Sequence, residues 1–336
     1  MRRVAVTGLG IVSPVGNTPD TFFRNLMSGV SGVKRLASGF SRMLSSPLAA
    51  EADFRAADFF SVKQLRNFDK STQLALIAAA QAWDDSGLAL SDGEKERAGV
   101  FMGTGLGGAH TLDDMHYQLY KENVARVSPL SITKIMCNAP ASHVSIRYGL
   151  SGPCLTYSIA CASSAVAIGE AYYRIKADLA DVVLAGGTES LLTFSSFKCW
   201  ESLGVLAKES ADPAASCRPF SKDRTGFVLG EGAALVILEE IERAKRRGAK
   251  IYGELIGYGS TADAGHITGP SVDGQARAMQ LALAEARTNP DEIDYLNAHG
   301  TATVMNDIVE TQAIKKVFGE RAFSLPVSST KSMHGH

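Results

Sequence analysis

The chain has 336 residues, of which 45% are hydrophobic and 21% are charged, and its formal net charge is −1. This composition predicts a globular protein with a large core, built as one broad domain or as two closely packed domains. The near-neutral charge argues against bulk electrostatic binding to nucleic acid or to a membrane, so an acidic partner would need a local basic patch.

Cysteine usage and the N-terminus indicate the compartment. The five cysteines show no C-x-x-C spacing, and they are Cys137, Cys154, Cys161, Cys199 and Cys217. This pattern predicts a reducing compartment, one reactive thiol and no zinc site. Gly8, Gly10 and Pro14 interrupt the first apolar stretch too early for a signal peptide, and no apolar run is long enough to span a membrane. We therefore expect a cytoplasmic protein with no membrane insertion.

Strands and helices are predicted to alternate along the first part of the chain. Residues 4–8 read as a buried strand that ends in a glycine turn, and residues 71–86 read as a buried helix rich in alanine and leucine. The further predicted elements are strands at 99–103, 181–187 and 233–238 and a helix at 161–177. This alternation predicts α/β layers.

A second half of the chain is predicted to begin after Gly248. Residues 239–247 read as a charged helix, and residues 251–259 read as a new strand followed by glycine, which echoes the start of the chain. The pattern is consistent with a half-repeat.

Residues 103–108 form a glycine-rich loop of the pattern G-x-G-x-x-G after a predicted strand. This pattern is typical of dinucleotide-binding turns. No clear acidic residue ends a second strand at the expected distance, and residues 113–118 look helical and polar. The sequence therefore disfavours a dinucleotide site.

Cys161 is the candidate nucleophile. It lies among small residues in Ile-Ala-Cys-Ala-Ser-Ser-Ala, where a short apolar run meets a predicted helix. Small neighbours let an acyl group approach, and the positive end of the helix favours thiolate over thiol. A buried structural cysteine is the ordinary alternative for a lone thiol. Two histidine motifs downstream favour the nucleophile: Asn-Ala-His-Gly-Thr-Ala-Thr at 297–303 and Ser-Thr-Lys-Ser-Met-His-Gly-His at 329–336.

These three segments, together with residues 3–10 and 218–232, resemble the β-ketoacyl-acyl-carrier-protein synthases of the thiolase superfamily, most closely the condensing enzymes of type II fatty-acid synthesis. The resemblance implies a five-layer αβαβα fold of two related halves. Residues 1–248 would carry the nucleophile, and residues 249–336 would form an incomplete second half that carries the catalytic histidines. In the family, a further segment supplies a gating aromatic, one oxyanion-hole N–H and the acid that pairs with the lysine.

The resemblance implies a catalytic role for four residues. Cys161 would carry the acyl chain, and His299 and His336 would stabilise an enolate by donating hydrogen bonds from neutral rings. Imidazole suits this role because its ordinary pKa of about 6.5 leaves it mostly neutral near pH 7. Lys331 would order the histidines. The ordinary alternatives are a core histidine at His299 and a solvated lysine at Lys331.

The resemblance also implies residues that bind substrate and partner. Thr301 and Thr303 would bind the pantetheine arm, or they would act as ordinary turn residues that cap the next helix. Leu106 would form a wall of the acyl pocket. Lys63 and Arg66 would dock an acidic acyl carrier protein, with a solvated basic helix face as the alternative.

The activity that the resemblance implies is a decarboxylative Claisen condensation of an acyl-enzyme thioester with malonyl-carrier protein, in fatty-acid elongation. This reaction uses neither a metal nor a redox cofactor, because the substrates are carried on the phosphopantetheine arm of acyl carrier protein. The family also implies a homodimer. The alternatives are a truncated, catalytically silent subunit that pairs with an intact ketosynthase, a polyketide-type ketosynthase, and a thiolase that uses coenzyme A.

Overall fold

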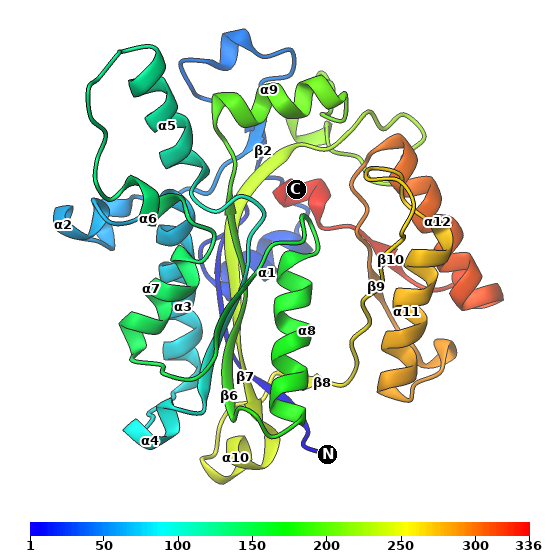
Figure 1. Cartoon of the computed structure of the whole chain (residues 1–336). Helices are drawn as coiled ribbons and strands as arrows, with labels where there is room; N and C mark the ends of the chain where they lie inside the picture. Colours follow the sequence, from blue (N-terminus) through cyan, green and yellow to red (C-terminus); the bar gives the residue numbers. More distant parts are fainter. The chain divides into compact units, whose positions relative to one another are not determined.

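The computed structural model describes residues 1–336 (Figure 1). The chain forms two compact units. The sheet unit contains Met1–Asn25, Glu51–Phe197 and Gly230–Leu255, and the histidine unit contains Leu26–Ala50, Lys198–Leu229 and Ile256–His336. Both units draw residues from each side of position 248, so the predicted boundary between two halves stays a prediction.

The sheet unit is built on one mixed sheet. Its strands, in spatial order, are β5 (Cys154–Tyr157), β4 (Ala98–Gly103), β6 (Val182–Ser190), β7 (Leu229–Glu240), β1 (Val4–Val12) and β8 (Gly253–Leu255). Strand β4 runs parallel to β5 and β6, whereas β7, β1 and β8 pair antiparallel with their neighbours. Every residue of β4 is buried, which is typical of a strand covered on both faces.

Helices cover both faces of this sheet. Helices α3 (Lys70–Ser86) and α7 (Ala139–Tyr148) lie on one face, and α8 (Ser163–Lys176) lies on the other (Figure 1). Close packing of α3 depends on two glycines of β1, because a Cβ atom on Gly8 or Gly10 would collide with the α3 backbone at Ala82 or Ala78. The α/β class predicted from the sequence is therefore confirmed.

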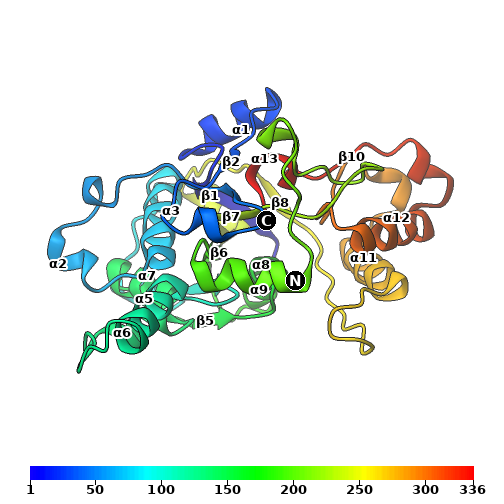
Figure 2. The same ribbon diagram turned by 90° about the horizontal axis from the view of Figure 1, so that it is seen from above.

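The histidine unit contains two packed helices and short strands. Helices α11 (Val272–Ala286) and α12 (Val304–Phe318) lie side by side (Figures 1 and 2). The two short strands β9 (Leu296–Asn297) and β10 (Val327–Ser328) run parallel. The hairpin of β2 (Val33–Arg35) and β3 (Leu48–Ala50) belongs to the same unit, as does α13 (Lys331–His334).

The remaining helices connect these elements. They are α1 (Pro19–Met27), α2 (Val62–Leu65), α4 (Asp92–Lys95), α5 (Ala109–Tyr120), α6 (Ser131–Ile135), α9 (Phe194–Leu203) and α10 (Ile241–Arg246). No helix is both long enough and apolar enough to cross a lipid bilayer.

Most predicted elements are confirmed within a few residues, but three differ. The helix predicted from residue 161 begins at Ser163, which leaves Cys161 in the preceding turn. The strand predicted over 251–259 is only Gly253–Leu255 and pairs with β1 at the edge of the sheet unit. The charged helix predicted from Glu239 begins at Ile241, and Glu239 lies in strand β7, where Thr7, Arg243 and Arg247 bind its buried carboxylate.

Candidate active site

Cys161 lies in a tight turn between β5 and α8 of the sheet unit, and it is exposed. Ala160, directly before it, has a φ of +44°, a left-handed conformation that non-glycine residues rarely adopt. Ser163 holds the turn, because its hydroxyl accepts a hydrogen bond from the N–H of Ile159 at 2.8 Å and donates to the carbonyl of Ala160 at 2.7 Å. The thiol is therefore presented at the surface of this unit by a fixed backbone.

Two glycines set the position of this turn on the sheet. Gly103 ends β4, and a Cβ atom there would collide with the backbone of Ser163 and Ser164. A Cβ atom on Gly187 of β6 would lie 2.6 Å from the Cβ of Ser164. The start of α8 therefore packs directly against β4 and β6, and a larger side chain at either glycine would displace it.

His299 and His336 come together in the histidine unit. His299 lies in the loop after β9, and His336 follows α13. Their ring centroids are 5.3 Å apart and the rings are nearly perpendicular, at 83°. The N–H of His336 donates to the carbonyl of Val228 at 2.8 Å, and its ring meets the ring of Phe227 edge to face at 5.2 Å. The structure thus brings two predicted site residues into contact across 37 positions of sequence.

Both imidazoles are neutral near pH 7. Loss of hydration, followed by the positive charge of Lys331, lowers the pKa of His299 to about 4, even though the residue remains partly open to solvent. Loss of hydration is also the main reason that the pKa of His336 falls to about 3, with smaller contributions from His299 and Lys331. A neutral ring can donate one hydrogen bond without carrying charge.

Lys331 is half-buried at the start of α13. Its positive charge helps to lower the pKa values of His299, His334 and His336. The ammonium group is therefore close enough to act on the two site histidines. His334 has a structural role, as its Nε2 bonds the hydroxyl of Thr330 at 3.0 Å.

Glu310 is a residue that the sequence interpretation missed. It is buried in α12, and its carboxylate accepts hydrogen bonds from the N–H groups of His299 and Gly300, each at 2.7 Å. Gly300 has a φ of +39°, a conformation that glycine adopts readily, and the carboxylate holds this turn beside the histidine. The signal was an acidic residue eleven positions after the histidine, in the second turn of α12. The acid that the family pairs with Lys331 is a separate expectation, and it stays a prediction.

Thr301 and Thr303 lie next to a cavity of about 580 Å³ in the histidine unit, and Thr303 lines it. Apolar side chains form much of its wall: Trp200, Leu203, Val205, Phe227, Ile267, Pro270, Val304 and Met305. The two threonine hydroxyls are 2.9 Å apart. Thr303 also caps α12 through the N–H of Asn306 at 3.4 Å, so the turn-residue interpretation holds for it alongside a place at the cavity.

The predicted docking residues Lys63 and Arg66 are both exposed in the sheet unit. Lys63 lies in α2, and Arg66 is the residue that ends it. Leu106 lies in the loop between β4 and α5 of the same unit, with 57% of its surface exposed.

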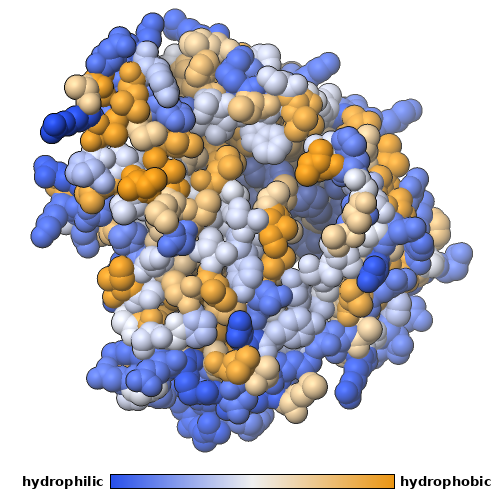
Figure 3. Space-filling view, in the orientation of Figure 1, coloured by the Kyte–Doolittle hydropathy of each residue, from blue (hydrophilic) through white to orange (hydrophobic).

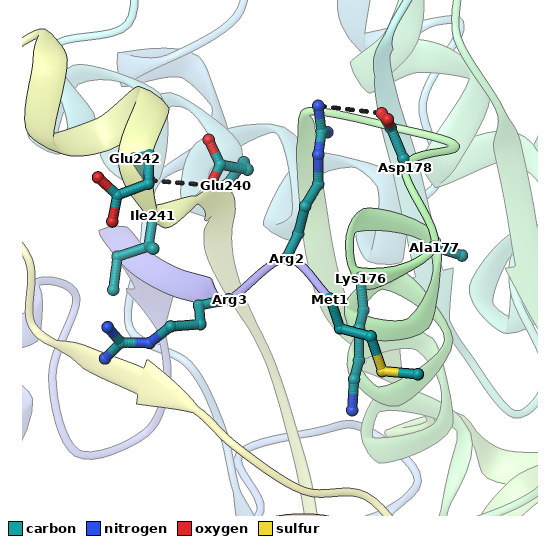
Figure 4. A pocket seen from close by; sticks show the side chains of 9 residues that line it. All are labelled: Met1, Arg2, Arg3, Lys176, Ala177, Asp178, Glu240, Ile241 and Glu242. Atoms are coloured by element: carbon teal, nitrogen blue, oxygen red, sulfur yellow. Dashed lines mark hydrogen bonds and ion pairs between the residues drawn. The ribbon is translucent and has the colours of Figure 1, made fainter.

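A shallow pocket of about 490 Å³ lies at the N-terminus of the sheet unit (Figure 4). The two arginines that line it are paired with acidic side chains. Arg2 bridges Asp178 at 3.0 Å and Asp181 at 2.5 Å, and Arg3 pairs with Glu254. None of the predicted site residues lines this pocket.

Cys161 belongs to the sheet unit and the two histidines belong to the histidine unit. The convergence of the thiol with the two rings, and the catalytic role of each residue, therefore stay predictions.

Comparison with known proteins matches both parts of the chain to one family. Residues 1–244 match the family described as Beta-ketoacyl synthase, N-terminal domain, and residues 252–336 match the one described as Beta-ketoacyl synthase, C-terminal domain. A Staphylococcus aureus protein named 3-oxoacyl-[acyl-carrier-protein] synthase 2 is 40% identical over 338 residues, covering 100% of this chain and 81% of the relative. A Synechocystis protein of the same name is 39% identical over 338 residues with the same coverage.

Solved structures share the fold over the whole chain. A type II PKS acyl-carrier protein in complex with its ketosynthase gives a TM-score of 0.91 at 36% identity, covering 100% of this chain and 82% of the other. A beta-ketoacyl synthase from Burkholderia phymatum gives a TM-score of 0.91 at 35% identity with the same coverage. The expected thiolase-like ketosynthase fold is thereby confirmed.

Proposed function

Because the chain belongs to the β-ketoacyl synthase family, we propose that it is a 3-oxoacyl-[acyl-carrier-protein] synthase that joins an acyl group to malonyl-carrier protein during fatty-acid elongation. The observation that carries the proposal is the pair of neutral imidazoles, His299 and His336, with ring centroids 5.3 Å apart. Two uncharged N–H donors held this close suit a reaction in which one oxygen gains negative charge.

The first half-reaction loads the acyl group. The Cys161 thiolate attacks the carbonyl carbon of the incoming acyl thioester, the new C–S bond forms, and the carrier leaves as a free thiol after taking a proton. The turn before α8 suits this step because it exposes the sulfur at the start of a helix, whose positive dipole end favours thiolate.

The second half-reaction forms the carbon–carbon bond. Malonyl-carrier protein loses CO2, and the electron pair of the broken C–C bond becomes an enolate whose oxygen accepts hydrogen bonds from His299 and His336. The enolate carbon attacks the acyl thioester, the C–S bond to Cys161 breaks, and the sulfur leaves as thiolate. The product is a 3-oxoacyl chain two carbons longer. Lys331 orders the two rings.

The substrate arm has a candidate site in the histidine unit. We place the pantetheine chain in the 580 Å³ cavity that Thr303 lines, with Thr301 beside it. The apolar wall suits the methyl groups of pantetheine, and the hydroxyls suit its amides. The chemistry is ionic throughout, so the proposed reaction uses no resident cofactor and no metal.

The proposed protein partner is acyl carrier protein. Lys63 and Arg66 are both exposed at one short helix, so an acidic surface can reach their charges directly. Exposed charges of this kind mainly speed encounter, and we expect the Michaelis constant for carrier substrates to rise steeply with salt.

A homodimer and a cytoplasmic location complete the proposal. Exposed apolar side chains gather over α5 and α6 (Figure 3), and they include Leu112, Leu130, Ile132 and Met136. Such a patch favours association between subunits. None of the five cysteines forms a disulfide, which suits a reducing compartment. We further propose halves of 1–248 and 249–336, which the matches at 1–244 and 252–336 support.

A polyketide-type ketosynthase is the second candidate. The type II PKS ketosynthase complex at TM-score 0.91 and 36% identity favours it. The two candidates differ in the acyl group that the thiol holds, which is a saturated chain in one case and a poly-β-keto chain in the other.

Intact-protein mass spectrometry after incubation with decanoyl-carrier protein tests the proposal. We expect the protein to gain one decanoyl group, and Cys161→Ala to gain none. Cys154→Ala is the matched control, because it removes another exposed thiol of the same unit. Malonyl-carrier protein should then release CO2 and the elongated product. If the protein is folded but never acylated, the proposed synthase activity is refuted and the silent-subunit alternative is favoured.

A further inference from the structure

The loop that carries Leu106, residues 104–108, is joined directly to the turn that carries Cys161. We call it the wall loop. The N–H of Thr104 donates to the carbonyl of Tyr157 at 3.1 Å, and the hydroxyl of Ser158 donates to the carbonyl of Gly105 at 3.0 Å. A shift of the wall loop would therefore displace Ser158, three residues before Cys161.

Glu189, the second-last residue of β6, holds the wall loop from below. Its carboxylate accepts hydrogen bonds from the N–H groups of Gly105 and Leu106 and lies 3.4 Å from the hydroxyl of Thr104. A Cβ atom on Gly105 would lie 2.8 Å from Glu189 Oε2, so only glycine admits the carboxylate this closely. Burial raises the pKa of Glu189 and the N–H donors oppose that rise.

The next residue, Ser190, holds the start of α5, just after the wall loop. Its hydroxyl donates to Glu231 at 2.6 Å and lies 2.9 Å from Nε2 of His110, at the start of α5. Glu231 is in turn paired with Lys70 at 2.7 Å. Consecutive residues of one strand thus hold the wall loop and the start of the helix that follows it, and Leu106 is exposed between these two contacts.

We propose that Glu189 is a positioning residue that sets which acyl chain lengths Cys161 accepts, by fixing Leu106 in the wall loop. The inference rests on the proposed function, since Leu106 bounds an acyl group only if Cys161 carries one. Strand β6 keeps its ladders to β4 and β7 without this side chain, so the carboxylate serves the loop and not the sheet. Without it, two backbone N–H groups lose a charged acceptor and Leu106 is free to move.

A competition experiment tests the inference. The protein is incubated with equal amounts of hexanoyl-, decanoyl- and hexadecanoyl-carrier protein, and the masses of the acylated products give the selectivity ratios. For Glu189→Ala we expect the hexadecanoyl-to-hexanoyl ratio to change by at least about fivefold, which corresponds to about 1 kcal/mol. Glu189→Gln should change it less, because its Oε1 keeps one acceptor for the loop.

Two further variants separate positioning from general damage. Asp181→Asn removes a partly buried, ion-paired acid just before the other end of β6, and its ratios should match those of the wild type. Ser158→Ala removes one of the two hydrogen bonds between the segments without touching Glu189, and it should shift the ratio in the same direction as Glu189→Ala.

The outcomes are distinguishable. If the wild type is never acylated at Cys161, the proposed function fails and the inference falls with it. If the wild type is acylated but Glu189→Ala lowers all three products equally, Glu189 has only a structural role and the inference alone is overturned.

Discussion

Replacement of Glu310 by glutamine should weaken the histidine unit and slow malonyl decarboxylation. The carboxylate accepts from the N–H groups of His299 and Gly300, each at 2.7 Å. A glutamine oxygen can accept only one of these bonds, and its NH2 group would face the other N–H. Loss of one hydrogen bond to a charged group costs about 1.5–3 kcal/mol. We expect the melting temperature to fall by about 3–6 °C.

The catalytic effect of Glu310→Gln should be confined to one half-reaction. A small displacement of a reacting group can cost up to about 100-fold in rate, so decarboxylation should fall by about 10- to 100-fold. Acylation of Cys161 should persist, because Glu310 lies in the histidine unit and the thiol lies in the sheet unit. Thermal unfolding, CO2 release and intact mass measure the three quantities separately.

Glu320→Gln is the matched control, because it makes the same chemical change at an exposed position of the same unit. Its stability should stay within about 0.5 kcal/mol of the wild type. If Glu310→Gln proves as stable and as active as Glu320→Gln, the carboxylate does not hold the His299 turn, and the reasoning from its two hydrogen bonds is refuted.

Three other predictions follow from the same contacts. The pKa of His336 is about 3 in the folded chain and about 6.5 in the unfolded chain. As pH falls, the unfolded chain binds a proton at this residue first, so the melting temperature should decline from pH 7 to pH 5. The decline should be smaller in His336→Asn. Gly103→Ala should cost about 1–3 kcal/mol of stability and impair acylation, because its methyl group would strike the α8 backbone at Ser163, whereas Gly93→Ala, with open space around it, should not. Arg224 donates to the carbonyls of Thr303 at 3.0 Å and Val304 at 2.6 Å, next to the proposed pantetheine cavity. Because both substrates carry the pantetheine arm, Arg224→Lys should raise the Michaelis constants for acyl-carrier and malonyl-carrier protein alike by about fivefold, measured by steady-state kinetics.

Local sequence predicted the elements that depend on local properties. The alanine-rich pattern over 71–86 predicted a helix, and α3 spans Lys70–Ser86. The apolar run over 99–103 predicted a strand, and β4 spans Ala98–Gly103. Predictions were poorer where residues distant in sequence determine the local conformation. Glu239 looked helical by its charge, but the arginines that bind its carboxylate keep it in a strand.

The candidate site divides in the same way. The sequence by itself predicted the chemistry, because a thiol among small residues and two histidines that each adjoin a glycine are set by residue type and by their nearest neighbours. Only the tertiary structure decided how these groups are held. The carboxylate of Glu310 reaches the backbone of His299, and that of Glu189 reaches Gly105, 84 residues away. Such hydrogen bonds depend on which strands and helices lie next to one another, and packing of the whole unit fixes that arrangement.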